Sequence, residues 1–171
     1  MRAFQTGGKR AGLSAAQKRG LKSKLNGRSA EDVLLNTDIE GMIFKRFEPY
    51  RRLTAGTIFK AQATDKAGCD YSVFTRHNAG MIEVKSREAD RVAVSVLDET
   101  QQAQLGDLAD MGRIALVLVR LRGEWYCVPY PVFKTPPKGK LSWSKADLAD
   151  YAVTVSDGVL HLNAHILRHY S

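Results

Sequence analysis

The sequence predicts an α/β domain with a central mixed β-sheet flanked by helices. The run from Ile114 to Val119 is continuously apolar and bounded by arginines, which is typical of a strand covered on both faces. Residues 70–86 contain two strand-like runs joined by a turn-rich segment. Between these regions, Asp98 precedes a segment with helical apolar spacing. A buried strand, a hairpin and an intervening helix together indicate a sheet with helices against its faces.

The N-terminal segment carries the excess positive charge of the chain. The 171 residues have a net charge of +8, and residues 1–28 contain no Asp or Glu. Few apolar residues offset the entropy of ordering there, so we expect a flexible basic arm before one domain of ordinary size over residues 29–171. The arm would contact nucleic-acid phosphates through counterion release; the alternatives are a solubilising tail or a transit peptide. Its candidate DNA-binding residues are Lys9, Arg10, Lys18, Arg19, Lys22, Lys24 and Arg28.

The segment after the arm predicts a helix followed by a strand. Ser29 is a suitable N-cap, and Asp32 stands at the capping-box position. Apolar residues from Val33 to Phe47 recur at three- and four-residue spacing, which indicates one helical face interrupted near residues 36–38 or at Gly41. Leu53 to Ala63 is rich in β-favouring residues and predicts a strand that leads toward Asp70.

Two carboxylates and a lysine form the candidate site. Alternation along a strand places Glu83 and Lys85 on one face, and the neighbouring apolar residues on the other. The turn-rich segment 76–80 folds the strand that begins at Asp70 back onto the strand of Glu83. We therefore expect Asp70 to lie near Glu83.

Such a site suits a divalent cation. Mg²⁺, or Mn²⁺ in its place, takes one or two protein carboxylates together with substrate phosphate oxygens. The ion would activate a water and stabilise the charge that develops during phosphodiester cleavage. Lys85 would orient that water or offset phosphate charge. The alternative is that Glu83 and Lys85 form an exposed ion pair of little energetic consequence.

The C-terminal half supplies the remaining elements. Residues 91–97 are expected to be extended, and a helix capped by Asp98 with Gln101 at the third position should end at Gly112. Residues 114–119 would form the sheet centre, with the next strand over residues 125–130. The later elements are expected to be a basic loop over 135–140 that contacts DNA or only links elements, a short helix over 144–151, and a hairpin over 152–155 and 159–162.

Cysteine and histidine usage argues against other metal chemistry. Cys69 and Cys127 are far apart in sequence, so a zinc site or a disulfide framework is not expected, and a reducing cytoplasm fits. His161, His165 and His169 recur at four-residue intervals without a nearby carboxylate cluster, which indicates structural roles. No apolar run reaches the roughly 18 residues that a membrane span needs, so we expect a soluble protein.

The order of the motifs resembles a known nuclease group. Asp70, twelve residues, then Glu83-Val84-Lys85 resembles the signature of the PD-(D/E)xK nuclease superfamily. The fuller pattern resembles RecU-type Holliday-junction resolvases, and it covers roughly residues 27 to 133. The further matching segments, in order, are Gly27 to Glu31, Asp70-Tyr71, Gln102, Gly112 to Arg120, and Trp125 to Pro129.

The resemblance implies a restriction-endonuclease-like fold and a role for each matched residue. Lys85 would position the attacking water, and Gln102 would support phosphate or metal. Glu31 would assist the metal, although an acid in a first helical turn also interacts favourably with the helix dipole. The implied catalytic residues are Asp70, Glu83, Lys85 and Gln102, and the implied Mg²⁺ ligands are Asp70, Glu83, the carbonyl of Val84, and Glu31.

The sequence also departs from this family. Cys69 stands where the superfamily carries its proline, and the family's Thr-Pro-rich segment is not found before Asp70. We expect a cytoplasmic homodimer, in a bacterial or phage-infected cell, that cuts four-way DNA junctions with paired nicks. Two alternatives stay open: a restriction-like or repair nuclease acting on other DNA, and a basic DNA-binding protein without catalysis.

Overall fold

The computed structural model describes residues 34, 37–46, 50–55, 58–63 and 68–170. The basic arm and most of the first turns of the helix expected from Ser29 lie outside these residues. The predicted α/β class is confirmed, because a mixed sheet with helices on its faces forms the centre of the described chain. No helix of the described residues is long and apolar enough to cross a membrane.

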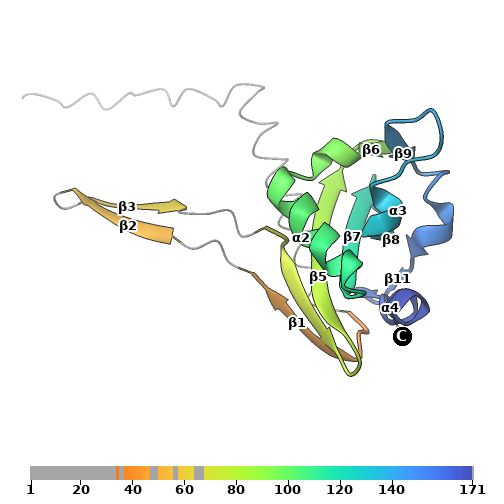
Figure 1. Ribbon diagram of the computed structural model, residues 1–171, viewed down its shortest axis with the longest axis horizontal. Helices are drawn as coiled ribbons and strands as arrows, with labels where there is room; N and C mark the ends of the chain where they lie inside the picture. Colours follow the sequence, from red (N-terminus) through yellow and green to blue (C-terminus); the bar gives the residue numbers. More distant parts are fainter. Residues whose placement is uncertain (1–33, 35–36, 47–49, 56–57, 64–67, 171) are drawn as a thin grey trace, which may run out of the picture.

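A six-stranded sheet organises the fold (Figure 1). In spatial order its strands are β1 (Gly41–Lys45), β4 (Tyr71–Thr75), β5 (Ala79–Arg87), β7 (Ile114–Leu121), β8 (Glu124–Pro129) and β10 (Ala152–Val153). Strands β5 and β7 run parallel, and the other neighbours are antiparallel. A parallel pair needs a crossover connection, which contains helix α2 (Glu99–Asp110).

Strand β7 lies inside the sheet, as its apolar sequence predicts. It is paired on both sides, and its residues from Ile114 to Val119 are fully buried. The hairpin to β8 turns at Arg122 and Gly123, whose φ angles are 46° and 90°. Two consecutive residues with positive φ are typical of the two-residue turns that match strand twist.

Each face of the sheet has its own apolar cluster. One cluster contains Ile82, Val84 and Trp125, and Ile166 of helix α4 (Asn163–Tyr170) packs with it. The other cluster contains Val117, Val119 and Leu105 of helix α2. Alternate residues of one strand therefore serve opposite cores, and Glu83 lies on the α2 side between Ile82 and Val84.

Helix α2 has the ends that the sequence predicts. The Asp98 side chain accepts a hydrogen bond from the N–H of Gln101, and the Gln101 side chain accepts one from the N–H of Asp98. This reciprocal capping box satisfies two backbone donors. The segment before it is only partly extended, since β6 (Arg91–Ala93) is followed by the 3-10 turn η1 (Val94–Val96).

The structure corrects two predictions in the N-terminal half. Residues Gly41–Lys45 form strand β1 and not part of a helix, because the partner β4 pairs with them along their whole length. The single strand predicted from Leu53 to Ala63 is a hairpin of β2 (Tyr50–Ala55) and β3 (Ile58–Ala63). Mixed apolar spacing does not distinguish a short strand from a helix turn, so pairing with the distant strand β4 decided the first case. The second case was decided by the local turn between β2 and β3.

The C-terminal elements agree in part with those predicted from the sequence. The helix predicted over 144–151 is a turn followed by the 3-10 segment η2 (Ala149–Tyr151). The hairpin expected over 152–155 and 159–162 is confirmed only between β11 (Val155–Ser156) and β12 (Val159–Leu160). Ala152–Val153 is strand β10 and pairs with β8 instead. The other short elements are the helix α3 (Tyr130–Phe133) and strand β9 (Ser142–Ser144), which pairs with β6.

Candidate active site

The candidate site lies where the start of β4, the middle of β5 and the start of α2 meet. Antiparallel pairing places Tyr71 opposite Ile82, so Asp70 stands opposite Glu83 at the next step. The N–H of Asp70 donates to Glu83 Oε2 at 3.1 Å, and the N–H of Val84 donates to Asp70 Oδ2 at 2.9 Å. Each carboxylate is therefore held by the backbone of the opposite strand, and the structure brings Asp70 and Glu83 together as predicted.

Glu83 is buried, which sequence alternation alone did not indicate. Its side chain is 1% exposed. Burial and, second, the nearby charge of Asp70 raise the pKa of this carboxyl to about 7, although Lys85 acts in the opposite direction. The alternative of an exposed Glu83–Lys85 ion pair is wrong, because α2 covers this part of the sheet face.

Lys85 joins the carboxylate to the helix. Its Nζ forms an ion pair with Glu83 Oε1 and donates to Gln101 Oε1 at 3.1 Å. The side chain is 19% exposed, so part of it remains accessible from solvent. An ammonium has three N–H donors, and these two contacts leave one that can reach a water or a phosphate oxygen.

The glutamine at the site is Gln101 and not Gln102. Gln101 Nε2 donates to Glu83 Oε1 at 2.7 Å, while its Oε1 accepts from Lys85 and caps Asp98. Gln102 instead donates to the carbonyl of Leu97 at 2.9 Å. Consecutive helical residues point about 100° apart, so only one of the two can face the sheet. The capping box identified Gln101 in the sequence, but only as a cap.

Replacing Gln101 by Ala should lower both stability and activity, and Gln102→Ala provides the matched control. Removal of the Gln101 amide leaves the buried Glu83 and Lys85 each short of a partner and also removes one of the two hydrogen bonds of the capping box. We expect a loss of about 2 kcal/mol in the free energy of unfolding, measured by urea titration. Gln102→Ala should change stability by less than about 1 kcal/mol. Equal effects of the two substitutions would contradict the assignment of Gln101.

Two residues that the sequence did not mark, Arg46 and Gln104, complete the surroundings of Asp70. The N–H of Arg46 donates to the carbonyl of Asp70 at 2.8 Å, which extends the β1–β4 ladder. Its guanidinium donates to Gln104 Oε1 at 3.1 Å and to Met81 Sδ at 3.4 Å. Neither acceptor carries a charge, so these contacts do not neutralise Arg46.

Gln104 also accounts for the glycine at position 68. Its Oε1 accepts from the N–H of Cys69 at 3.2 Å. Gly68 has a φ of +75°, and a Cβ there would lie 2.0 Å from Gln104 Oε1. A glycine therefore allows the chain before Asp70 to pass against α2.

The donor chemistry of this site fits a hard divalent cation. Asp70 and Glu83 supply carboxylate oxygens, which Mg²⁺ prefers. Burial raises the pKa of the Cys69 thiol to about 12, so this neighbour stays protonated and is no competing ligand. The described residues hold no group of three or more His, Cys, Asp or Glu side chains able to bind a metal. Glu31, the further acidic ligand that the resemblance implies, lies outside the described residues, as do the seven basic residues of the arm.

The three C-terminal histidines occupy separate surroundings from this site. His161 contacts Asp38 Oδ2 through Nδ1 at 3.2 Å and Ser156 Oγ through Nε2 at 2.6 Å. Asp38 Oδ1 accepts from the N–H groups of Leu162 and Asn163 at 2.6 and 2.9 Å. These contacts tie the start of α4 to the chain before β1, which is a structural role.

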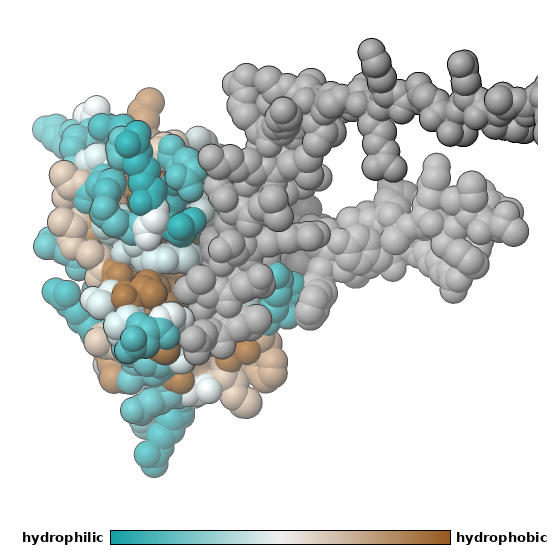
Figure 2. All heavy atoms as spheres, turned by 180° about the vertical axis from the view of Figure 1, so that it is seen from behind, coloured by the Kyte–Doolittle hydropathy of each residue, from teal (hydrophilic) through white to brown (hydrophobic). Residues whose placement is uncertain are grey.

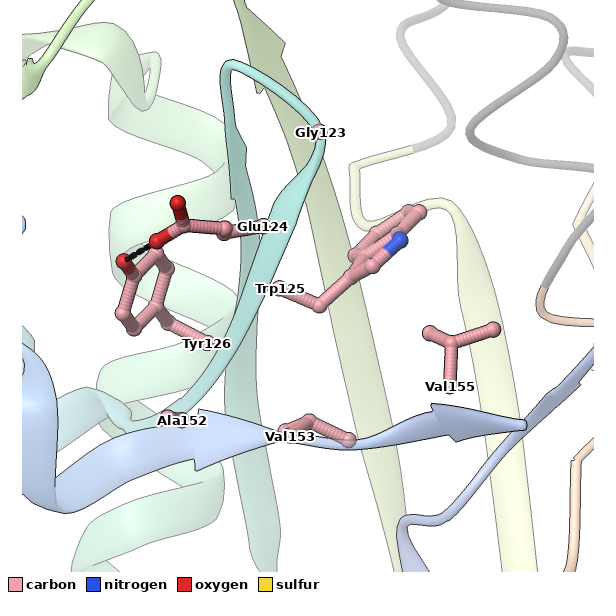
Figure 3. A pocket seen from close by; sticks show the side chains of 7 residues that line it. All are labelled: Gly123, Glu124, Trp125, Tyr126, Ala152, Val153 and Val155. Carbon is pink, nitrogen blue, oxygen red and sulfur yellow. Dashed lines mark hydrogen bonds between the residues drawn. The ribbon is translucent and has the colours of Figure 1, made fainter.

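A pocket of about 270 Å³ opens on the opposite sheet face, beside Trp125 (Figure 3). Val153 and Val155 form its apolar side. Its carboxylate, Glu124, accepts from the Tyr126 hydroxyl at 2.7 Å and forms an ion pair with Lys145. The pocket is therefore apolar with one neutralised acid, unlike the site at Glu83.

No family model matches this chain, and no curated protein matches it. Among solved structures, the chain is similar to Hjc, a Holliday junction resolvase from the archaeal hyperthermophile Archaeoglobus fulgidus. The similarity covers 58% of this chain and 77% of the other chain, with 18% sequence identity and a TM-score of 0.37. The function proposed below rests on the residues and contacts of this chain.

Proposed function

We propose that this protein is a metal-dependent endonuclease that hydrolyses phosphodiester bonds in branched DNA, resolving Holliday junctions by paired nicks. The Glu83 carboxylate carries this proposal. It is 1% exposed, stands opposite Asp70, and bonds with both Lys85 and Gln101. A buried carboxylate with a raised pKa opposes folding, and such groups concentrate at functional sites.

Asp70 and Glu83 would hold Mg²⁺, which Mn²⁺ can replace, with the carbonyl of Val84 and Glu31 as the further ligands. When bound, the ion supplies positive charge at the phosphate and lowers the pKa of a coordinated water. The chain itself supplies the position of the two carboxylates, through the backbone hydrogen bonds of the β4–β5 pair. Those bonds orient the oxygens before any ligand arrives.

Lys85 would orient the attacking water or contact the scissile phosphate with its remaining donor. Gln101 would act as a positioning residue, because it holds both the lysine and the carboxylate on the sheet face. Hydrolysis by direct attack of water needs no covalent intermediate with the protein. The roles of Asp70, Glu83 and Lys85 are those first inferred from the sequence, and Gln101 replaces Gln102.

Branched DNA is the preferred substrate for two reasons. The ordered motifs resemble those of junction resolvases, and the net charge of +8 favours a polyanionic partner. A four-way junction with twofold symmetry requires two incisions. A homodimer with two identical sites is the simplest assembly that provides them.

Cleavage of a substrate panel tests this proposal. Four-way, forked and linear duplex DNA would be incubated with the full chain and Mg²⁺, with EDTA as the control. We expect paired, symmetric cuts in the four-way junction only. Cuts confined to the other DNAs would indicate a restriction-like or repair nuclease, and binding without cuts a DNA-binding protein. Either of these outcomes would overturn the proposed activity.

A further inference from the structure

We propose that the uncovered face of β1 and β4, defined by Met42, Phe44 and Phe74, binds unstacked bases next to the scissile phosphate. This aromatic platform deepens the proposed nuclease function and rests on it. Its side chains are among the most exposed large apolar groups of the described residues: Met42 is 58% exposed, Phe44 52% and Phe74 43%. Exposed aromatic residues gathered on one face mark an interaction surface.

Strand register places this platform in line with the active site. Met42 pairs with Phe74, and Phe44 pairs with Ser72. The next pair with side chains on the same face is Arg46 and Asp70. Alternate residues share a face, so the aromatic rows and the site lie on the same side of the sheet, about 7 Å apart for each two-residue step.

Helix α2 covers only part of this face. It packs on β7 and β5, next to the site, and among the described residues no other helix lies over β1 and β4 on this side of the sheet (Figure 1). The opposite side of the same strands is used for folding, because Ile43 and Val73 pack in the cluster with α4. From the side opposite to Figure 1, the described surface is mostly hydrophilic with scattered apolar areas (Figure 2). Phe44 and Phe74 therefore belong to neither of the two apolar clusters.

The shape and charge of the platform suit nucleic-acid bases. The two phenylalanine rings lie 6.0 Å apart at 71°, so one ring presents its face beside the edge of the other. Every base has a π-face, and stacking on aromatic side chains is independent of sequence. Arg46 stands at the active-site end of the platform and exposed Arg76 follows its other end, so phosphates on both sides of a stacked base would meet positive charge.

This arrangement favours DNA over a second copy of the chain as the occupant. Three side chains on the edge strand β1 and its neighbour β4 are a small area compared with the ~800 Å² per partner of a stable interface. Flanking arginines are complementary to phosphates but would repel the same arginines of another copy across a twofold axis. Continuity with the carboxylate site adds a reason for a strand of DNA to pass here.

Binding measurements with calcium in place of magnesium test the platform separately from cleavage. The variants are Phe44→Leu with Phe74→Leu, which keep apolar bulk but remove the rings, and the corresponding pair of Trp substitutions. Leu141→Ala, at a residue 90% exposed, is the control. We expect the double Leu variant to bind forked DNA with unpaired arms about 100-fold more weakly, about tenfold for each ring, while duplex affinity stays unchanged. The Trp pair should restore binding.

The possible outcomes separate this inference from the nuclease proposal. Unchanged affinity of the double Leu variant for forked DNA would overturn the platform even if the wild type cuts junctions. Ring-dependent binding by a protein that never cuts would support the platform and overturn the activity. A change of molar mass in light scattering, with equal losses for forked and duplex DNA, would assign the face to a dimer interface and also overturn the inference. Circular dichroism of each variant would test that it is folded.

Discussion

Replacing Asp70 by Asn or Glu83 by Gln should reduce Mg²⁺-dependent DNA cleavage by at least about 1,000-fold while leaving DNA affinity nearly unchanged. Each substitution keeps the size of the side chain and removes one negative charge. The site would then lose a charged oxygen ligand, and with it the electrostatic stabilisation of the reacting phosphate. Single-turnover cleavage of labelled junctions measures the first effect, and fluorescence anisotropy in Ca²⁺ measures the second.

Glu99→Gln is the matched control for this experiment. Glu99 is an exposed acid in the first turn of α2, close in sequence to Gln101 but separate from the two carboxylates. Its loss should change cleavage by less than about threefold, since an exposed acid in a first helical turn contributes at most about 1 kcal/mol. Retained cleavage by both Asp70→Asn and Glu83→Gln would contradict the site assignment.

The stability of the metal-free protein should fall as pH rises from about 4.5 to above 7, and Glu83→Gln should remove much of this fall. The pKa of Glu83 is raised from 4.5 to about 7, mainly by burial and then by the charge of Asp70. The folded state therefore binds the proton more tightly than the unfolded state. The contribution of Glu83 to stability is fully present below about pH 4.5 and is lost as pH rises through 7.

The size of this effect follows from the shift. A pKa unit corresponds to about 1.4 kcal/mol, so the wild type should lose about 3 kcal/mol relative to Glu83→Gln between pH 4.5 and pH 8. Urea unfolding of both proteins at these two pH values, with EDTA present, measures the difference. A pH-independent difference would show that Glu83 ionises in the folded protein as it does in the unfolded chain.

Magnesium should offset most of the stability that the wild type loses relative to Glu83→Gln at pH 8. An ion that binds only the folded wild type adds about 2.7 kcal/mol to its free energy of unfolding when its concentration is 100 times Kd. Glu83→Gln should gain much less, since it lacks one anionic ligand. We expect Glu83→Gln to be more stable than the wild type without metal and inactive with it. This result would show that Glu83 serves function at a cost in stability.

Several elements of the fold follow from local sequence signals. The apolar run from Ile114 predicts the central strand because a strand covered on both faces has no polar alternation. Asp98 with Gln101 predicts the start of α2 because a capping box depends on four neighbouring residues only. Strand β1 was missed, since Gly41–Lys45 becomes a strand by pairing with β4, which lies distant in sequence.

The candidate site was also predicted only in part from local sequence signals. Alternation put Glu83 and Lys85 on one face, and the turn between the strands brought Asp70 to them. The choice between Gln101 and Gln102 depends on how α2 is rotated against the sheet, which neither residue reveals locally. Arg46 carries no motif and reaches Asp70 only through the β1–β4 ladder.

By itself the sequence determined the strand, hairpin and cap signals and the pairing of two acids with a lysine, because these depend on residues within one strand or one turn. Only the tertiary structure decided that Glu83 is buried, that Gln101 holds it, and that Phe44 and Phe74 stay uncovered. The physical reason is that burial and exposure depend on which distant element packs on a face. Helix α2 covers the β5–β7 part of the sheet and leaves β1 and β4 open.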